Sequence, residues 1–141
     1  SPVQTRVALE NLSRLAPPVR GVSQRRGSLG GVPARWFTPH GAHAQGPVLM
    51  HIHGGGFALC SSHVHATFIG ELARAINCRA VGIDYRLAPE HPFPLPIEDC
   101  YSAYLGLLGC SALAVLTPWT RSLTVRTLSV IPAMACATSP R

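Results

Sequence analysis

The stretch HGGGF, residues His53–Phe57, follows directly on the apolar run Val48–Ile52. A short apolar run that ends in turn residues predicts a buried strand. Three consecutive glycines then present bare backbone, and glycine permits the positive φ values and close approach of a tight turn. Acyl-transfer enzymes direct such backbone N–H groups at the negative oxygen of a tetrahedral intermediate. The stretch therefore predicts a strand that ends in an oxyanion-binding turn.

A second motif, IDYRLAPEHPFP at Ile83–Pro94, follows another short apolar strand at Ala80–Ile83. A strand followed by HGGG is an oxyanion-hole signature of α/β-hydrolase esterases. Together the two motifs closely resemble the hormone-sensitive lipase family of α/β-hydrolases, which includes bacterial acetyl esterases and arylacetamide-deacetylase-like enzymes. The resemblance runs from about Thr5 to about Leu108. It implies an α/β fold and hydrolysis of carboxylic esters by a serine nucleophile.

Hydrophobic periodicity agrees with this fold class. The pattern predicts a helix at 5–15, hairpin strands at 19–24 and 32–37 joined through 27–31, a strand at 48–52, a helix at 65–77, a strand at 80–83 and a helix at 96–108. This order implies a hairpin followed by parallel crossover units. We therefore expect an incomplete α/β-hydrolase fold, consisting of the amino-terminal half of the sheet with its flanking helices.

Two of these helices have a predicted apolar face. In the first helix the face consists of Val7, Ala8, Leu12 and Leu15. In the last helix it consists of Ile97, Cys100, Tyr101, Tyr104, Leu105 and Leu108.

The composition changes after Leu108. Residues 109–141 contain no Asp, Glu, Lys, His or Asn, and nine of these 33 residues are Ser or Thr. They show neither a helical period nor strand alternation. We therefore predict two regions: 1–108, the amino-terminal part of an α/β-hydrolase domain, and 109–141, an aberrant or unstructured tail. A shifted reading frame or an aberrant splice would produce such a tail.

No Gly-x-Ser-x-Gly occurs in the 141 residues, so the usual nucleophile turn is absent. Ser111 has Leu113 where the second glycine belongs, and the helix at 96–108 leaves no room for a strand before it. Ser61 and Ser62 also lack flanking glycines. We therefore assign no catalytic nucleophile, acid or base, and promote neither Asp84 nor Asp99 to that role.

The resemblance implies roles for the motif residues. Gly55 and Gly56 supply two oxyanion donors, and Gly54 lets the turn form; the alternative is that the glycines simply form a tight turn. His53 anchors the loop rather than acting as a base. The remaining supporting residues are Phe57, Asp84, Tyr85 and Arg86, of which Asp84 and Arg86 are each expected in a hydrogen-bonded ion pair. The family often has glycine where this chain has Cys60.

Metal and nucleic-acid ligands are not expected. His51 and His53, and again His63 and His65, have the H-x-H spacing that can bind zinc, but no carboxylate or cysteine is placed convincingly with them. The net charge is +6, yet all twelve basic residues are arginines dispersed along the chain, which argues against nucleic-acid binding. We predict no cofactor.

The cysteines and the apolar runs bear on the compartment. The five cysteines form no C-x-x-C pair, so neither a disulfide framework nor a zinc site follows, and a reducing compartment is expected. No apolar run reaches the roughly 18 residues of a membrane span. No signal peptide is visible, which favours a cytoplasmic protein, although a chain that begins with Ser1 leaves the native start open.

Two hypotheses for function follow. The first is an esterase ancestry, with small esters as substrates if the fold is completed, and a chain that is truncated and inactive alone. The second is a non-catalytic binding or regulatory half-domain, or the product of a pseudogene. In the resembled sheet, strand 48–52 lies between strand 80–83 and the strand before the nucleophile, which we expect this chain to lack. Strand 48–52 would then be an exposed edge and a site of self-association.

Overall fold

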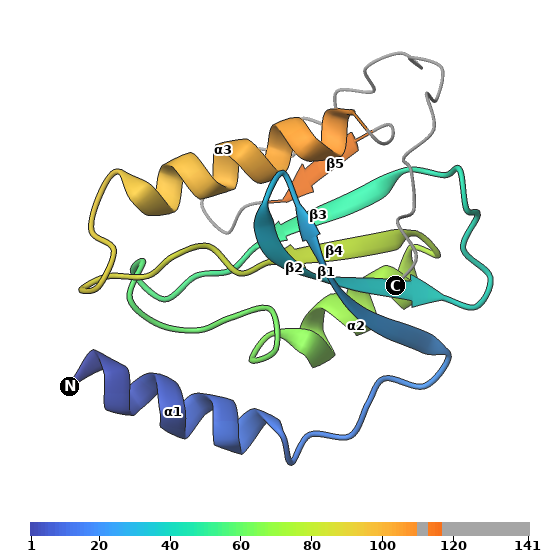
Figure 1. Ribbon diagram of the computed structural model, residues 1–141. Helices are drawn as coiled ribbons and strands as arrows, with labels where there is room; N and C mark the ends of the chain where they lie inside the picture. The colour runs from blue at the N-terminus through green and yellow to red at the C-terminus, as the bar shows by residue number, and fades with distance from the viewer. Residues whose placement is uncertain (110–112, 117–141) are drawn as a thin grey trace, which may run out of the picture.

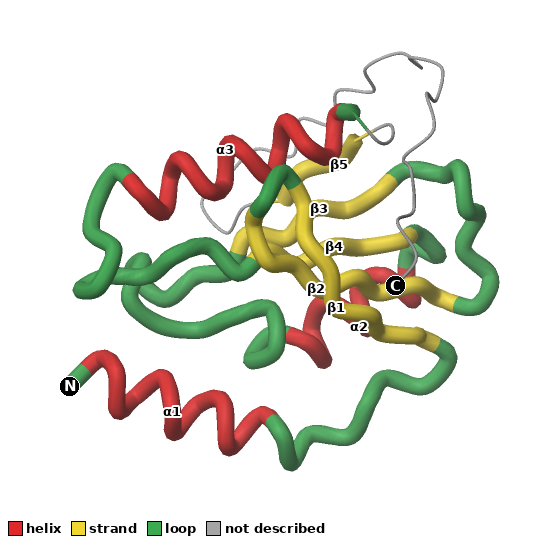
Figure 2. The backbone as a smooth tube through the Cα atoms, viewed as in Figure 1, coloured by secondary structure: helices red, strands yellow, loops and turns green. Residues whose placement is uncertain are grey.

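The structure, a computed structural model, describes residues 1–109 and 113–116. The elements are α1 (Pro2–Ser13), β1 (Val22–Leu29), β2 (Val32–Pro39), β3 (Val48–Ile52), α2 (Ala66–Ala75), β4 (Arg79–Ile83), α3 (Leu95–Leu108) and β5 (Leu113–Leu116). Figures 1 and 2 show a central sheet with α2 and α3 on different sides of it. The predicted order of elements over residues 5–108 is confirmed.

The sheet places the two motif loops next to each other. Its strands lie in the order β1-β2-β4-β3-β5, in which β1, β2 and β4 pair antiparallel. β3 pairs parallel with β4, and Ile52 at the end of β3 lies opposite Ile83 at the end of β4. The segments that follow these two residues contain the glycine motif and the second motif. Both motifs therefore begin at the carboxyl edge of the parallel strands, where open α/β sheets bind ligands.

Two apolar cores lie on opposite faces of the sheet. Successive residues of a strand point to opposite faces. Val81 of β4 belongs to the core that includes Leu107 of α3, whereas the preceding Ala80 belongs to the core that includes Ile69 of α2. β3 is divided between the cores in the same way. The central strands are thus buried on both faces, as their continuous apolar runs predict.

The β1–β2 hairpin differs from its predicted boundaries. β1 continues to Leu29, and the turn is the pair Gly30-Gly31, with φ values of +58° and +82°. Two residues with positive φ make the tight turn that matches strand twist, so residues 27–29 remain in the strand. A Cβ at Gly30 would lie 2.0 Å from the carbonyl oxygen of Ser102 in α3. The hairpin tip therefore needs glycine for close approach as well.

The predicted apolar face of α3 is confirmed only at Cys100 and Tyr104, which pack against the core; its other four residues are exposed. Ala103 and Leu107 are buried, whereas Tyr101 and Leu105 are 61% and 48% exposed. A Cβ at Gly106 would lie 2.4 Å from the backbone nitrogen of Gly30. The close approach of the hairpin tip turns the small residues of α3 toward the sheet, and the exposed residues of the predicted face lie away from it.

The predicted packing of α1 is also wrong, although the helix exists. It starts at Pro2 because the Ser1 side chain accepts a hydrogen bond from the Gln4 backbone and the Gln4 side chain bonds back to Ser1, in a capping box. None of its residues is buried, and Val7 and Leu12 are 57% and 65% exposed. α1 is therefore held by something other than an apolar face.

The expectation that β3 is an edge strand is corrected. β5 pairs with β3 in parallel register, with Val48 opposite Leu113 and His51 opposite Leu116. β3 therefore has a neighbour on each side, and its backbone is not the open edge through which self-association was expected. β5 falls within the segment predicted as a tail; the rest of that segment, residues 110–112 and 117–141, lies outside the described residues.

Candidate active site

The glycine motif forms a compact turn after β3, which we call the glycine turn (Gly54–Leu59). Gly55 and Gly56 have φ values of +116° and +62°, in the region that favours glycine. A Cβ at Gly55 would lie 2.4 Å from the carbonyl oxygen of Leu59, whereas one at Gly54 meets nothing within 4 Å. The turn therefore requires glycine strictly at position 55.

The hydrogen bonds of this turn leave its first N–H groups available. The carbonyl of Gly55 accepts from the backbone N–H groups of Ala58, at 3.1 Å, and Leu59, at 3.0 Å. Across residues 1–109 and 113–116, the N–H groups of residues 54–56 donate to no protein acceptor. Gly55 is half-buried and Gly56 is exposed. Adjacent donors at the carboxyl edge of the sheet are thus free to bind an oxygen atom from outside the chain.

His53 is buried beneath the turn and is held from two sides. Its Nδ1 lies 2.9 Å from the Gly54 carbonyl oxygen, and its ring stacks on Tyr85 with centroids 4.2 Å apart. The Tyr85 hydroxyl donates to the His53 carbonyl at 2.7 Å. Burial lowers the pKa of His53 below its ordinary value and raises that of Tyr85. Both side chains are therefore neutral near pH 7, in keeping with supporting contacts.

Asp84 and Arg86 have different partners: the expected ion pair is present for Arg86, whereas for Asp84 the expectation is corrected. Asp84 accepts from the backbone N–H and the hydroxyl of Ser62, at 2.6 and 2.8 Å. Arg86 donates to Asp99 of α3, with its closest contact at 2.7 Å. The chain after β4 carries Asp84 toward the segment before α2 and Arg86 toward α3. Hydrogen bonds from Arg86 lower the pKa of Asp99.

The glycine turn and the segment after β4, which we call the β4 loop (Asp84–Pro94), are bonded to each other. Phe57 is exposed, has a φ of +58°, and its carbonyl accepts from the Ala88 backbone N–H at 2.8 Å. Its ring meets Tyr85 edge-on, with centroids 6.1 Å apart. The two motifs of the sequence are therefore parts of one site.

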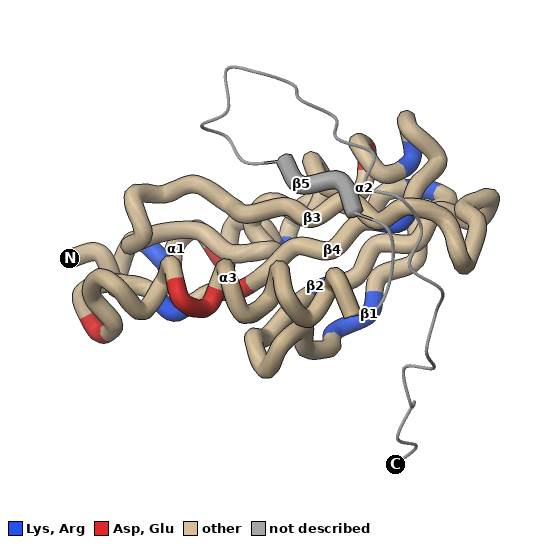
Figure 3. The backbone as a smooth tube through the Cα atoms, turned by 90° about the horizontal axis from the view of Figure 1, so that it is seen from above, with Lys and Arg blue, Asp and Glu red and all other residues tan. Residues whose placement is uncertain are grey.

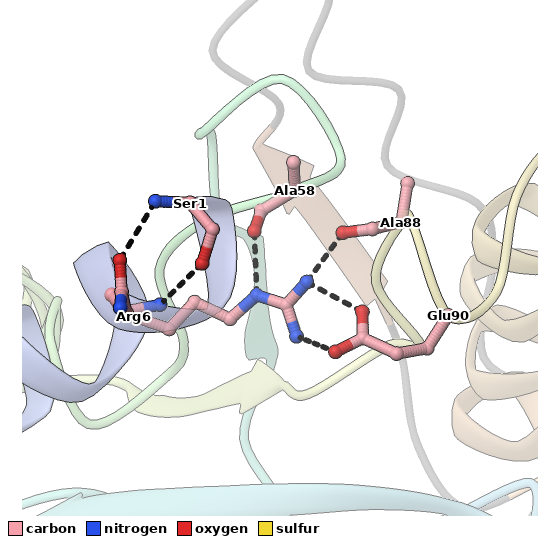
Figure 4. Close-up of polar contacts among 6 residues, drawn as sticks. Ser1, Arg6, Ala58, Ala88 and Glu90 are labelled. Carbon is pink, nitrogen blue, oxygen red and sulfur yellow. Dashed lines mark hydrogen bonds and ion pairs between the residues drawn. The ribbon is translucent and has the colours of Figure 1, made fainter.

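Arg6 of α1 contacts both loops, and sequence reasoning missed it. Its Nε donates to the Ala58 carbonyl at 2.7 Å, and its terminal nitrogens donate to the Ala88 carbonyl and to Glu90, the latter at 2.7 and 3.0 Å (Figure 4). Its partners lie 52 to 84 residues away in the chain. A lone arginine in a helical pattern carries no signal of such distant partners.

The serines near the turn are engaged in structural contacts. Ser62 is buried and bonded to Asp84, and the Ser61 hydroxyl donates to Glu10 of α1. Ser111 lies outside the described residues. In the part of the chain that the structure describes, neither of these two hydroxyls is hydrogen-bonded to a histidine ring, so neither resembles an activated nucleophile.

A histidine pair lies between β3 and α2. His51 Nε2 lies 3.1 Å from His65 Nδ1, and the His53 ring is 6.1 Å from that of His65. Burial, with smaller contributions from His65 and His53, lowers the pKa of His51 to about 4. Burial also lowers the pKa of His65. In the part of the chain that the structure describes, no group of three or more His, Cys, Asp or Glu side chains is arranged to hold a metal ion.

Charged residues are spread over several elements. Arg25 and Arg26 are adjacent on β1, and Figure 3 shows blue, basic segments on β1 and at other places along the chain, with red, acidic segments elsewhere. Among the helices of residues 1–109, none combines the length and the apolar character needed to cross a membrane.

Comparison with known proteins finds similarity to α/β-hydrolases. A family model described as the alpha/beta hydrolase fold matches residues 49–122, which include both motifs and extend beyond Leu108, where the sequence suggested that the resemblance ends. The chain is 34% identical over 108 residues to an esterase of Acinetobacter venetianus, covering 77% of this chain and 35% of that protein. It is 38% identical over 78 residues to hormone-sensitive lipase of Homo sapiens, covering 55% of this chain and 7% of that protein.

Solved structures of hormone-sensitive lipase family esterases are similar to this chain as well. An esterase from the bacterial hormone-sensitive lipase family superposes with a TM-score of 0.74 and 34% identity, over 83% of this chain and 40% of that one. A hormone-sensitive lipase from a metagenome library superposes with a TM-score of 0.75 and 32% identity, over the same shares of the two chains. The chain thus spans well under half the length of these relatives.

Proposed function

Because the chain belongs to the hormone-sensitive lipase family of α/β-hydrolases, we propose that it supplies the oxyanion-binding part of a carboxylic ester hydrolase. The substrates of the completed enzyme would be small carboxylic esters, attacked by a serine nucleophile. Gly55 and Gly56 would donate their backbone N–H groups to the oxygen that becomes negative in the tetrahedral intermediate. Esterases among the relatives support this assignment of the reaction.

One observation carries the proposal: the backbone N–H groups of Gly55 and Gly56 have no acceptor within residues 1–109 and 113–116. A half-buried N–H group such as that of Gly55 is normally paired, so this donor and its exposed neighbour at Gly56 suit an external acceptor. They follow β3 at the carboxyl edge of the parallel strands. The positive φ values of both glycines are what a simple tight turn would also need, but such a turn does not require the unpaired donors.

The other motif residues would support the donors. His53 would anchor the start of the glycine turn through its bond to the Gly54 carbonyl, and Tyr85 would hold His53 by stacking and by its hydroxyl. Asp84 would fix the segment after the turn through Ser62. Arg86 would fix the β4 loop against α3 through Asp99.

The 141-residue chain by itself would not hydrolyse esters. Its sequence has no Gly-x-Ser-x-Gly, and Ser61 and Ser62 are committed to carboxylates. Oxyanion donors and binding without the triad retain only a small part of an enzyme's rate enhancement. Gly55 and Gly56 would therefore act together with a nucleophile and a base that the 141 residues do not provide.

An ester assay of this chain tests the proposed lack of turnover. We expect no hydrolysis of p-nitrophenyl butyrate above the buffer rate. Purified Ser111→Ala protein serves as the matched control and should give the same trace. Turnover that is present in the unchanged chain and lost in Ser111→Ala would make Ser111 the nucleophile and contradict the proposal.

A further inference from the structure

Helix α1 is attached to the rest of the molecule by polar contacts. None of its residues is buried, yet Arg6 is 20% exposed at its side chain and has four hydrogen bonds to two other segments. The second contact is that of Glu10 with the Ser61 hydroxyl. The position of α1 is therefore set by charged side chains directed at the loops around the candidate oxyanion donors.

The Arg6 guanidinium contacts the glycine turn at the residue that closes it. The Ala58 N–H donates to the Gly55 carbonyl, and the Ala58 carbonyl accepts from Arg6 Nε at 2.7 Å. The same guanidinium reaches the β4 loop at Ala88 and Glu90. A planar guanidinium presents donors in a fixed fork, so one side chain can set the relative position of three acceptors.

The glycine turn needs such an external restraint. Besides the two glycines, Phe57 in the turn and Cys60 directly after it have φ values of +58° and +70°, which side-chain-bearing residues rarely adopt. Strained backbone of this kind persists where the surrounding structure over-determines it. The described hydrogen bonds that join this turn to the β4 loop are the Ala88 N–H to Phe57 carbonyl bond and those of the Arg6 bridge; the rings of Phe57 and Tyr85 also meet.

We propose that Arg6 is a positioning residue for the oxyanion donors: it bridges the glycine turn and the β4 loop, and so holds the N–H groups of Gly55 and Gly56 outward and unpaired. The inference rests on the proposed function of these two glycines. Arg6 touches neither donor and acts through Ala58. The bridge itself can be tested without any ester chemistry.

Hydrogen–deuterium exchange at micromolar protein concentration tests whether Arg6 protects the backbone N–H groups of the two loops. In Arg6→Met, the peptides that contain Ala58–Leu59 and Ala88 should exchange at least about tenfold faster, because their N–H groups bond across the restrained turn. The β4 peptide at 79–83 should keep its rate. Arg74→Met is the matched control, because Arg74 pairs with Glu71 at 2.6 Å on α2 and contacts neither loop. Unchanged exchange in Arg6→Met, or equal acceleration in Arg74→Met, would overturn the inference.

Two further variants separate a bridge from a simple charge pair. Arg6→Lys keeps the charge but loses the fork, and should restore less than half of the lost protection. Glu90→Gln removes the ion pair but leaves the bonds of Arg6 to Ala58 and Ala88, and should have the smaller effect. Full rescue by lysine, or a Glu90→Gln effect as large as that of Arg6→Met, would show that charge alone matters and would overturn the bridging role.

The amide resonances of Gly55 and Gly56 connect the bridge to the site. In the unchanged protein, sodium butyrate should shift these two resonances, and in Arg6→Met the shift at equal butyrate should fall by at least about half. An equal shift in both proteins would overturn the positioning role. If butyrate leaves both resonances unmoved even in the unchanged protein, the proposed function of the glycines fails, while the exchange experiment still decides whether Arg6 restrains the turn.

Discussion

The residues of the glycine turn show where backbone geometry restricts the sequence. Position 55 excludes a side chain through both its φ of +116° and the nearby Leu59 carbonyl, while position 54 excludes one through neither. Position 60 needs positive φ but carries cysteine. The backbone therefore requires glycine at position 55, tolerates a side chain at position 54, and is unfavourable for the cysteine that follows the turn at position 60.

Replacement of Cys60 by glycine should stabilise the protein. The φ of +70° at Cys60 is costly for a residue with a Cβ, so Cys60→Gly should raise the free energy of unfolding by about 0.5–1 kcal/mol, net of the extra freedom of the unfolded chain. Urea unfolding measures the change. Cys60→Ala removes the thiol but keeps the Cβ, so a gain of the same size in that variant would show that the backbone is not the cause.

His51 should make stability depend on pH in a defined window. Because its pKa falls from 6.5 to about 4 on folding, the unfolded chain binds the proton first, and stability is lost as the pH falls from 6.5 toward 4. The loss should reach up to about 3 kcal/mol. Asp99, whose pKa is lowered, loses its contribution only at still lower pH.

Urea unfolding at pH 7.0 and pH 4.5 measures this effect. His51→Asn should reduce the difference between the two pH values, and His40→Asn, on the exposed surface, should leave it unchanged. The same pH dependence in His51→Asn as in the unchanged protein would show that the groups responsible lie elsewhere.

At the scale of elements, the contact between the hairpin tip and α3 decides which side of α3 is buried. Gly30→Ala would place a Cβ 2.0 Å from the Ser102 carbonyl oxygen, so the tip and the helix must separate, at a cost of about 2–4 kcal/mol. Gly31 also has a positive φ, but a Cβ there would meet no atom within 4 Å. Gly31→Ala should therefore lower the free energy of unfolding by only about 1 kcal/mol. Equal melting temperatures for the two variants would contradict the close approach.

The helices and strands also show which features of the fold the sequence patterns could predict. The strand at 48–52 was predicted with the observed ends, and β4 and α3 differ from their predictions by one residue, because continuous apolar runs and helical spacing are local signals. The packed side of α3 was not predictable from bulk alone, since small residues at Ala103 and Gly106 admit the hairpin. β5 was missed because its pairing with β3 is a long-range contact.

For the candidate site, too, local motifs were predictable from the sequence and long-range contacts were not. The oxyanion role of the glycine turn could be proposed from the two motifs, but the hydrogen-bond partners of the surrounding residues could not. Asp84 bonds to Ser62, 22 residues earlier, and Arg6 reaches residues up to 84 positions away. Such pairings depend on how loops meet in space, and nothing in the composition or periodicity of either segment specifies them.

At the scale of the whole molecule, the described residues match part of the α/β-hydrolase fold of longer relatives. The five-stranded sheet has α2 and α3 on opposite faces, and α1 is held by polar contacts. The chain covers 40% of the two solved relatives. The central claim is that Gly55 and Gly56 act as oxyanion donors once a nucleophile is supplied. A chimera can supply it, with residues 1–108 of this chain replacing the matching segment of the Acinetobacter venetianus esterase.

The decisive measurement is kcat for p-nitrophenyl butyrate in this chimera, compared between Gly54→Ala and Gly55→Ala. Gly54 has open space around its Cβ position, so its variant should keep kcat within roughly threefold. Gly55→Ala displaces the donors and should lower kcat by about 10²–10³-fold with little change in KM. Equal kcat values in the two variants would contradict the assignment of the glycine turn as the oxyanion site.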